Sequence, residues 1–203
     1  MEIQKQKLLQ RLKNFGFDKK IIKAFEKVRR EDFIPPENKR FAYDDTALPI
    51  GYGQTISQPY TIAFMLSRLQ AGPGMKIMEV GSGSGYVLAL LNEISPKSQI
   101  YGTERIDDLV KKSRQIMKNH KNIKIFSASK NLGLPDKKYF DRILISAGSD
   151  TLPPELLNQL SDDGIMICPV GNSIVRAKKI KRVIETEEYP GFIFVPLIKD
   201  DPI

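Results

Sequence analysis

The chain has 203 residues, of which 41% are hydrophobic and 28% are charged, and this length and composition predict one domain with a single sizeable core. The 32 Lys+Arg and 24 Asp+Glu residues give a net charge of +8, but the basic residues are scattered and do not alternate with aromatic ones. We therefore expect a solvated surface and no nucleic-acid partner. Neither a run of about eighteen apolar residues nor an apolar signal segment is present, so we expect no membrane contact and a cytoplasmic location. We also expect a monomer.

The sequence offers little for metal or nucleophilic chemistry. Cys168 is the single cysteine, which excludes an intrachain disulfide and a metal site built from several cysteines. His120 is the single histidine and lies in the polar stretch K-N-H-K-N, so neither a histidine zinc site nor a serine–histidine relay is indicated. We expect no metal, and catalysis has to come from other groups.

Two helices are predicted at the start of the chain. Apolar residues recur at helical spacing over residues 3–15, and Gly16 closes this helix. Asp18 stands where the N-cap of a second helix belongs, and apolar residues lie on one face of the ten residues that follow it.

A long connection follows these helices. Pro35 and Pro36 interrupt regular structure, so residues 30–58 are predicted to form a loop with turns. A structureless loop of that length inside a compact domain is more often functional than accidental. We therefore divide the single domain into a helical cap with a substrate loop, residues 1–58, and a sheet core, residues 59–203.

Short apolar strands alternate with amphipathic helices from residue 59 onward. This alternation predicts a parallel sheet with helices on both faces, a doubly wound α/β fold. Helices are expected at about 59–69, 84–94, 106–119 and 153–160, and strands at 76–80, 99–103, 123–127, 141–146 and 164–169. The last segments have no helices of useful length between them, so they are predicted to pair antiparallel at one edge of the sheet. These segments are residues 174–177, 180–186 and 192–197.

A glycine-rich stretch, M-E-V-G-S-G-S-G-Y at residues 78–86, follows the first predicted strand of the core. Glycines allow a sharp turn from strand to helix and a close approach of the backbone to a ligand. The spacing is G-x-G-x-G, whereas a dinucleotide fold normally shows G-x-G-x-x-G with the helix N-terminus facing a pyrophosphate. The spacing therefore favours S-adenosylmethionine (SAM), which has no phosphate, over NAD. The alternative is a tight turn that binds no ligand.

Glu104 ends the next predicted strand, 23 residues after Gly81. An acidic residue about twenty positions beyond the glycine turn is where a Rossmann-like site binds ribose, because a carboxylate accepts hydrogen bonds from both hydroxyls. The alternative is a carboxylate paired with Arg105 at the start of a helix.

Two motifs together indicate a family. The run A-Y-D-D-T-A-L-P-I-G-Y-G-Q-T-I-S-Q-P, at residues 42–59, followed by E-V-G-S-G-S-G-Y, resembles the protein-L-isoaspartate O-methyltransferase family, repair enzymes that use SAM. Further matches make the resemblance cover nearly the whole chain. They are F-D-R-I at 140–143, P-P-E-L-L-N-Q-L at 153–160, C-P-V-G at 168–171 and F-V-P-L at 194–197.

The resemblance implies a Rossmann-like class I SAM methyltransferase fold, in which the order of the last strands is altered relative to other SAM methyltransferases. It implies that Ser57 is the catalytic residue and that Glu79 lies beside the methionine portion of SAM. It implies isoaspartyl-containing proteins and peptides as partners. The residues expected to bind the cofactor are Gln54, Thr55, Glu79, Gly81, Ser82, Gly83, Glu104, Arg105 and Ser129.

Ser129 is a departure from the family. The family has a Gly-Asp-Gly-like turn after its third core strand, and its acidic side chain helps to bind the adenine end of SAM; here the segment is S-A-S-K-N-L-G-L-P. A serine forms a hydrogen bond but carries no charge, so weaker cofactor binding or help from the neighbouring backbone is expected.

Ser57 has two interpretations. It suits the N-cap of a helix that begins near Pro59, and it also suits a contact to a substrate carboxylate. Such a carboxylate has a pKa of about 4 and is ionised at neutral pH, so no general base is needed. The enzyme has to align the carboxylate oxygen with the methyl group and exclude water, and a hydroxyl that donates to the other carboxylate oxygen contributes to this.

Three alternatives to protein carboxyl methylation stay open. A methyltransferase of nucleic acids or small molecules would use the same cofactor half, but the segment I-S-A-G-S-D-T-L-P-P-E lacks the aromatic residue of base-amine methyltransferases. Methyltransferases that act on a cytosine carbon need a Pro-Cys nucleophile on a loop after the fourth strand, whereas here Cys168 precedes Pro169 on the fifth. A non-catalytic relative would bind cofactor or peptide without turnover; the intact T-I-S argues against it, whereas Ser129 leaves room for it.

Overall fold

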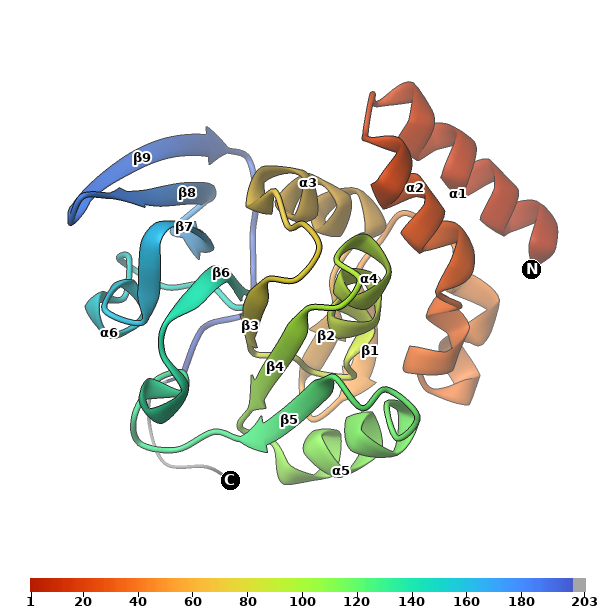
Figure 1. Ribbon diagram of the computed structural model, residues 1–203. Helices are drawn as coiled ribbons and strands as arrows, with labels where there is room; N and C mark the ends of the chain where they lie inside the picture. The colour runs from red at the N-terminus through yellow and green to blue at the C-terminus, as the bar shows by residue number, and fades with distance from the viewer. Residues whose placement is uncertain (199–203) are drawn as a thin grey trace.

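The structure, a computed structural model, describes residues 1–198 of the 203. Its centre is a seven-stranded sheet with the order β5-β4-β3-β6-β7-β8-β9 (Figure 1). The strands are β3 (Lys76–Val80), β4 (Gln99–Glu104), β5 (Ile123–Ser127), β6 (Phe140–Ile145), β7 (Leu160–Val170), β8 (Ser173–Ile180) and β9 (Val183–Pro190).

The strand directions confirm the predicted fold class. The five strands β3, β4, β5, β6 and β7 are parallel, and β8 and β9 extend the sheet antiparallel at the edge beside β7. Because β7, β8 and β9 are consecutive and adjacent, the sheet ends in a meander. From the family resemblance we expected the order of the last strands to differ from that of other SAM methyltransferases, and the consecutive order β7-β8-β9 is consistent with this.

Six α-helices accompany the sheet in the described part of the chain. They are α1 (Glu2–Asn14), α2 (Lys19–Lys27), α3 (Pro59–Leu69), α4 (Tyr86–Ile94), α5 (Asp107–Ile116) and α6 (Pro154–Leu157). The predicted helix at 153–160 was too long, because the chain already enters β7 at Leu160. Asp18 does stand at the N-cap position of α2, but its side chain forms no capping hydrogen bond there.

The two faces of the sheet are covered unequally. Alternate residues of β3 point to opposite faces, so Ile77 joins one apolar cluster while Met78 and Val80 join another. The helices α1 to α5 pack into the first cluster, whereas α6 and the loops near it pack into the second. The prediction of helices on both faces is therefore correct in kind, but one face carries little more than a single helical turn.

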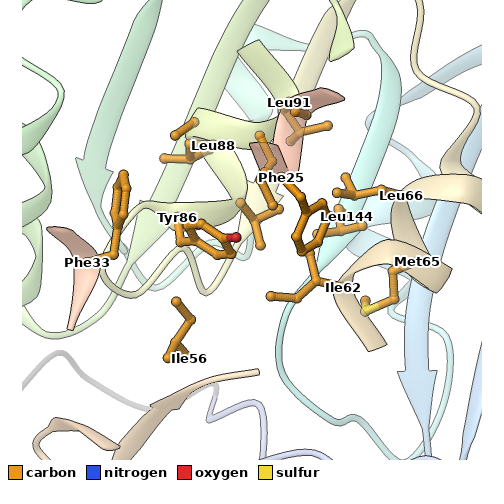
Figure 2. Close-up of a cluster of buried hydrophobic side chains, with 14 of the residues drawn as sticks. Phe25, Phe33, Ile56, Ile62, Met65, Leu66, Tyr86, Leu88, Leu91 and Leu144 are labelled. Carbon is orange, nitrogen blue, oxygen red and sulfur yellow. The ribbon is translucent and has the colours of Figure 1, made fainter. Parts of the chain in front are cut away.

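Helix α4 links the N-terminal helices to the sheet. Seven of its nine residues are buried, because α2 covers its outer side while the sheet lies beneath it. Figure 2 shows Tyr86, at the start of α4, among Phe25 and Phe33 from the N-terminal region. Its ring lies 6.1 Å from that of Phe25 and 5.3 Å from that of Phe33, distances at which tilted aromatic pairs are attractive. The cap and the core therefore share one hydrophobic interior.

Residues 30–58 contain more regular structure than predicted. Two 3-10 helices, η1 (Arg30–Phe33) and η2 (Pro36–Phe41), precede an antiparallel hairpin of β1 (Leu48–Gly51) and β2 (Gln54–Ile56). The expectation of a structureless loop was wrong, because strands of four and three residues are too short to show an alternating pattern. One of the predicted turns, in the segment P-I-G-Y-G, joins the two strands, with positive φ angles of 96°, 55° and 69° at Gly51, Tyr52 and Gly53.

The C-terminal prediction needs two corrections. The segment predicted as a strand at 180–186 is interrupted by a turn at Lys181 and Arg182, which both have positive φ angles. Residues 192–197 do not add a strand to the sheet; they lie against the loop after β6, with Gly148 donating to Val195 O at 2.7 Å and Leu197 donating to Gly148 O at 2.6 Å. Pro196 has no N–H for a ladder, which explains why an apolar extended segment fails to pair.

The helices of residues 1–198 include none that combines the length and the apolar character required to cross a bilayer.

Candidate active site

The glycine turn joins β3 to α4 as predicted. Gly81, Gly83 and Gly85 all have positive φ angles, of 77°, 51° and 87°. The amides of Gly81 and Ser82 both donate to Thr103 O on β4, at 2.9 and 3.0 Å. A Cβ on Gly85 would approach Ser113 Cβ of α5 to 3.3 Å, so this glycine also permits close packing of the two helices.

Glu104 fixes the turn from the end of β4. Its Oε2 accepts from the Gly83 amide at 2.9 Å and its Oε1 accepts from the Ile106 amide at 3.0 Å. These amides, rather than the guanidinium of Arg105, are the partners of the carboxylate. Since an ionised carboxylate has about four acceptor positions, Glu104 keeps capacity for a ligand.

A cavity of about 420 Å³ lies over the carboxyl ends of the parallel strands, where open α/β sheets bind ligands. It brings together most of the residues predicted for the cofactor: Gln54, Thr55, Gly81, Gly83, Glu104, Arg105 and Ser129. Glu79 and Ser82 are not among its lining residues, and their roles stay predictions. Lining residues that were not expected in the cofactor site include Ile50 of the hairpin, Ser146 and Ala147 after β6, and Gln159 after α6.

The space in the cavity depends on the missing side chain of Gly83. A Cβ at Gly83 would lie only 3.2 Å from Ile50 Cδ1, so a side chain there would press on the hairpin that forms the opposite wall. The cavity thus depends on the glycine in the turn and on the β1–β2 hairpin, which Figure 1 shows beside α4 and β4. We call this space the cofactor cavity.

Glu79 is buried rather than exposed. Only 1% of its surface is accessible to solvent, although it stands next to the end of β3. Its Oε1 lies 2.7 Å from Ser146 Oγ, and its Oε2 has no hydrogen-bond partner in the described structure. Burial raises the pKa of Glu79 to about 8, and the negative charge of Glu104 acts in the same direction, while the Ser146 hydroxyl opposes them. Glu79 is therefore protonated at neutral pH.

Ser129 lies in the exposed loop after β5. Its hydroxyl donates to Asn131 O at 3.1 Å within the same loop. Gln159 ties that loop down, since its Oε1 accepts from the Leu134 amide at 2.8 Å and its Nε2 donates to Leu132 O at 2.7 Å. Ser129 is thus placed on the cofactor cavity, without the negative charge that the family has at this position.

Ser57 lies in a second, wider space of about 1020 Å³, which we call the substrate groove. Hydroxyl groups and aromatic rings dominate its lining. The hydroxyl residues are Thr46, Thr55, Ser57, Tyr60, Thr61, Ser146 and Tyr189, and the phenylalanines are Phe64, Phe192 and Phe194. Asp45 is the charged residue that lines it, and no lysine or arginine is among its described lining residues.

The two spaces share a wall. Thr55, Ser146 and Val195 line both of them. A group that passes from a cofactor to a substrate therefore passes these three residues.

Ser57 is not the cap of α3. The N-cap position is occupied by Gln58, and the free amide of Tyr60 is bonded by Asp45 Oδ1 at 2.9 Å instead. The Ser57 side chain is therefore not required by the helix, although its main chain is fixed by Arg30, whose Nη2 donates to Ser57 O at 3.1 Å.

These features define a class I SAM-dependent methyltransferase: a mostly parallel sheet, a glycine turn, an acidic residue at the end of the next strand and a cavity above them. The profile described as "Protein-L-isoaspartate(D-aspartate) O-methyltransferase (PCMT)" matches residues 3–201, and the chain belongs to this family.

Several relatives match almost end to end. A protein-L-isoaspartate O-methyltransferase of Methanococcoides burtonii is 39% identical over 198 residues, with 94% of this chain and 98% of the relative covered. One of Thermosipho melanesiensis is 38% identical, with 94% and 100% covered. A crystal structure of a protein-L-isoaspartate O-methyltransferase from Plasmodium falciparum in complex with S-adenosyl-L-homocysteine is similar with a TM-score of 0.84 and 29% identity, covering 96% of this chain and 98% of that one.

Proposed function

We propose that this protein transfers the methyl group of SAM to the free carboxylate of L-isoaspartyl residues in damaged proteins and peptides. The observation that carries the proposal is the shared wall of Thr55, Ser146 and Val195, which joins a cavity suited to SAM to a groove suited to a peptide carboxylate.

The cofactor cavity has the groups that SAM requires. Glu104 would accept from the ribose hydroxyls, and the glycine turn would allow the methionine portion to lie against the backbone. The hairpin residues Gln54 and Thr55 would cover the cofactor from the side of the substrate groove. Bound SAM supplies an activated methyl group, so the chain itself need not provide a nucleophile.

The substrate groove suits an anionic nucleophile that must stay reactive. An isoaspartyl carboxylate is ionised at neutral pH and needs no base. A lysine or arginine contact would neutralise it, whereas hydroxyls orient it at a smaller cost in nucleophilicity. Ser57 would donate to one carboxylate oxygen and leave the other to face the methyl group across the shared wall.

The groove also favours a peptide over a nucleic acid. Nucleic-acid binding depends on neutralising phosphates with lysine and arginine, and the described lining of the groove contains neither. Its phenylalanines and tyrosines suit the apolar side chains and backbone of a peptide. The product ester would close spontaneously to a succinimide as the neighbouring backbone amide displaces methanol, and hydrolysis would return part of it to aspartate.

The test is a direct comparison of substrates. The protein is incubated with SAM labelled in its methyl group and with an isoaspartyl peptide, its normal aspartyl isomer, DNA or RNA. Label is expected in the isoaspartyl peptide alone, as a base-labile ester. Equal labelling of the two peptides, or stronger labelling of nucleic acid, would overturn the proposal.

A further inference from the structure

Ser146 is the residue that connects the two spaces to a buried acid. It follows β6 directly, and its amide donates to Val80 O at 2.9 Å, which fixes its main chain beside the glycine turn. Ser146 lines both spaces, and its Oγ lies 2.7 Å from Glu79 Oε1. A hydroxyl at the point of methyl transfer is therefore coupled to a carboxyl group that lines neither space.

The substrate groove leaves a carboxylate with few charged partners. Because the described lining contains no lysine or arginine, the hydrogen bonds to the carboxylate must come from hydroxyls and amides. Ser57 supplies one hydroxyl from the peptide side of the groove. Thr55 and Ser146 are the hydroxyl residues that lie on the wall shared with the cofactor cavity, and of these two Ser146 has the buried partner.

We propose that Ser146 is a second contact for the substrate carboxylate, beside Ser57, and that Glu79 is the positioning residue that sets the direction of the Ser146 hydroxyl. This inference rests on the proposed function of the site and names a further residue in it. When Glu79 is protonated, its O–H donates to Ser146 Oγ, and the hydroxyl proton of Ser146 is free for the substrate. When Glu79 is ionised, its carboxylate accepts a hydrogen bond from the Ser146 hydroxyl, and the substrate loses its own hydrogen bond from Ser146.

Ionisation of Glu79 would weaken substrate binding in a second way. Only Ser146 would then separate the buried negative charge of Glu79 from the carboxylate of the substrate, and the two charges would repel each other. Burial raises the pKa of Glu79 to about 8, so the favourable direction of the hydrogen bond prevails at neutral pH. The apparent Michaelis constant for the peptide should therefore rise at alkaline pH.

Within residues 1–198, no counter-ion that would favour the ionised form is paired with Glu79. Glu79 faces the same side of the sheet as Ile77, the side that α3 and α4 cover. No hydrogen bond or ion pair of the described structure joins Glu79 to an ionisable group of those helices, namely Tyr60, Arg68, Tyr86 and Glu93. Of the two strands beside β3, β4 contributes Glu104, whose charge also disfavours ionisation of Glu79. The other strand, β6, contributes Asp141 and Arg142; Asp141 accepts from the Lys76 amide and Arg142 donates to Gln70 O and Asp141 O, and neither is bonded to Glu79 in the described structure.

The experiment measures steady-state methylation at saturating SAM from about pH 5.5 to about pH 9.5, a range that spans the titration of a raised carboxyl pKa. The peptide is capped at both ends and contains isoaspartate as its single ionisable group, so an alkaline effect belongs to the enzyme. Ser146→Ala is expected to raise the Michaelis constant roughly 10- to 100-fold at neutral pH, the effect of losing one hydrogen bond to a charged group. Its dissociation constant for SAM, measured by calorimetry, should change by less than about twofold.

Three further variants separate a contact from a structural role. Ser146→Thr keeps the hydroxyl and should restore most of the affinity for the peptide. Glu79→Gln keeps the volume and a donor but cannot ionise, so its Michaelis constant for the peptide should no longer rise at alkaline pH. Ser161→Ala removes a hydroxyl that bonds Asp141 at 3.4 Å, away from both spaces, and should resemble the wild type.

Two results would overturn the inference alone: a wild-type Michaelis constant in Ser146→Ala, or an alkaline rise that persists in Glu79→Gln. A wild-type protein that methylates no isoaspartyl peptide would overturn the proposed function and this inference with it.

Discussion

Arg30 and Ser57 are 27 residues apart in the chain, but the side chain of Arg30 binds the backbone of Ser57: its Nη2 donates to the Ser57 carbonyl oxygen at 3.1 Å. The same guanidinium donates to the carbonyl oxygens of Ala42, Asp44 and Thr46, at 2.8, 3.3 and 3.0 Å. The Arg30 side chain is fully buried, and its burial lowers its pKa. It therefore fixes the segment that leads to Ser57 by hydrogen bonds to its backbone.

Arg30→Lys is expected to lower the free energy of unfolding by about 2–4 kcal/mol, because an ammonium group cannot reach four carbonyl oxygens that a planar guanidinium spans. Urea denaturation measures this loss. Arg29→Lys is the matched control, since the Arg29 side chain is 60% exposed and forms ion pairs with the buried Glu31 and the exposed Asp32. A variant as stable as the wild type would show that the carbonyl oxygens are equally well bound by other groups.

Ser57→Ala should leave SAM binding nearly unchanged and lower methylation strongly, because the change removes a proposed contact to the substrate carboxylate and none to the cofactor cavity. Its stability should also match the wild type, since Gln58 occupies the N-cap of α3 and the Ser57 carbonyl is retained. Single-turnover methyl transfer and thermal unfolding together check this. Wild-type transfer rates would remove Ser57 from the catalytic role.

The sheet and the glycine turn could be predicted because their signals are local. Each parallel strand is a short apolar run, and the turn after Val80 is marked by glycines at fixed spacing. Glu104 could be found by its distance from that turn. These residues meet at the carboxyl edge of the sheet whatever the details of packing.

The remaining parts of the site depend on tertiary contacts without a local pattern. Arg30 stands in the charged run R-R-E-D, which is typical of an exposed surface, yet it is fully buried by the segment that it binds. Ser146 is a single serine after a strand, without a motif around it, and its proposed role rests on its hydrogen bond with Glu79 of the neighbouring strand. The hairpin at 48–56 was missed because its strands are too short to alternate, although it forms one wall of the cofactor cavity.

Glu104→Ala is expected to weaken SAM binding by about 1.5–3 kcal/mol, the range for a hydrogen bond to a charged group. Because the carboxylate also bonds the Gly83 and Ile106 amides, Glu104→Gln is needed beside it: the amide keeps one acceptor for the turn and removes the charge. Asp107→Ala, which loses a carboxylate bonded to Ser127 outside the cavity, is the control. Calorimetry with SAM measures all three, and an unchanged affinity in both Glu104 variants would place the ribose elsewhere.

Glu79 should make the protein less stable as the pH rises. Its pKa is about 8 in the folded protein and 4.5 in the absence of burial, so the folded state holds the extra proton between these values. The contribution to stability is therefore complete below about pH 4.5, declines above it and is lost once the pH passes about 8. Over this window the loss amounts to a few kcal/mol. Denaturation at several pH values should show that the free energy of unfolding depends less on pH in Glu79→Gln than in the wild type. The same decline in both proteins would contradict a raised pKa of Glu79 as its cause.

Discrimination between isoaspartyl and aspartyl peptides should survive high salt. The two isomers have the same charge and differ by one methylene moved between backbone and side chain, so net charge cannot separate them. The groove offers Asp45 as its charged lining residue, and that carboxylate is already engaged by the Tyr60 amide at 2.9 Å and by Arg11 at 3.7 Å. Discrimination then depends on the spacing between the hydroxyls that bind the carboxylate and the surface that receives the flanking peptide.

The net charge of +8 acts at longer range, where salt screens exposed charges beyond about 10 Å at about 0.1 M. Raising the salt from about 0.05 M to about 0.5 M should therefore raise the Michaelis constant for an acidic isoaspartyl peptide modestly and leave that for a neutral one nearly constant. The ratio of kcat/KM between isoaspartyl and aspartyl isomers should stay the same for both peptides. A ratio that collapses with salt would mean that long-range attraction, rather than the geometry of the groove, selects the substrate.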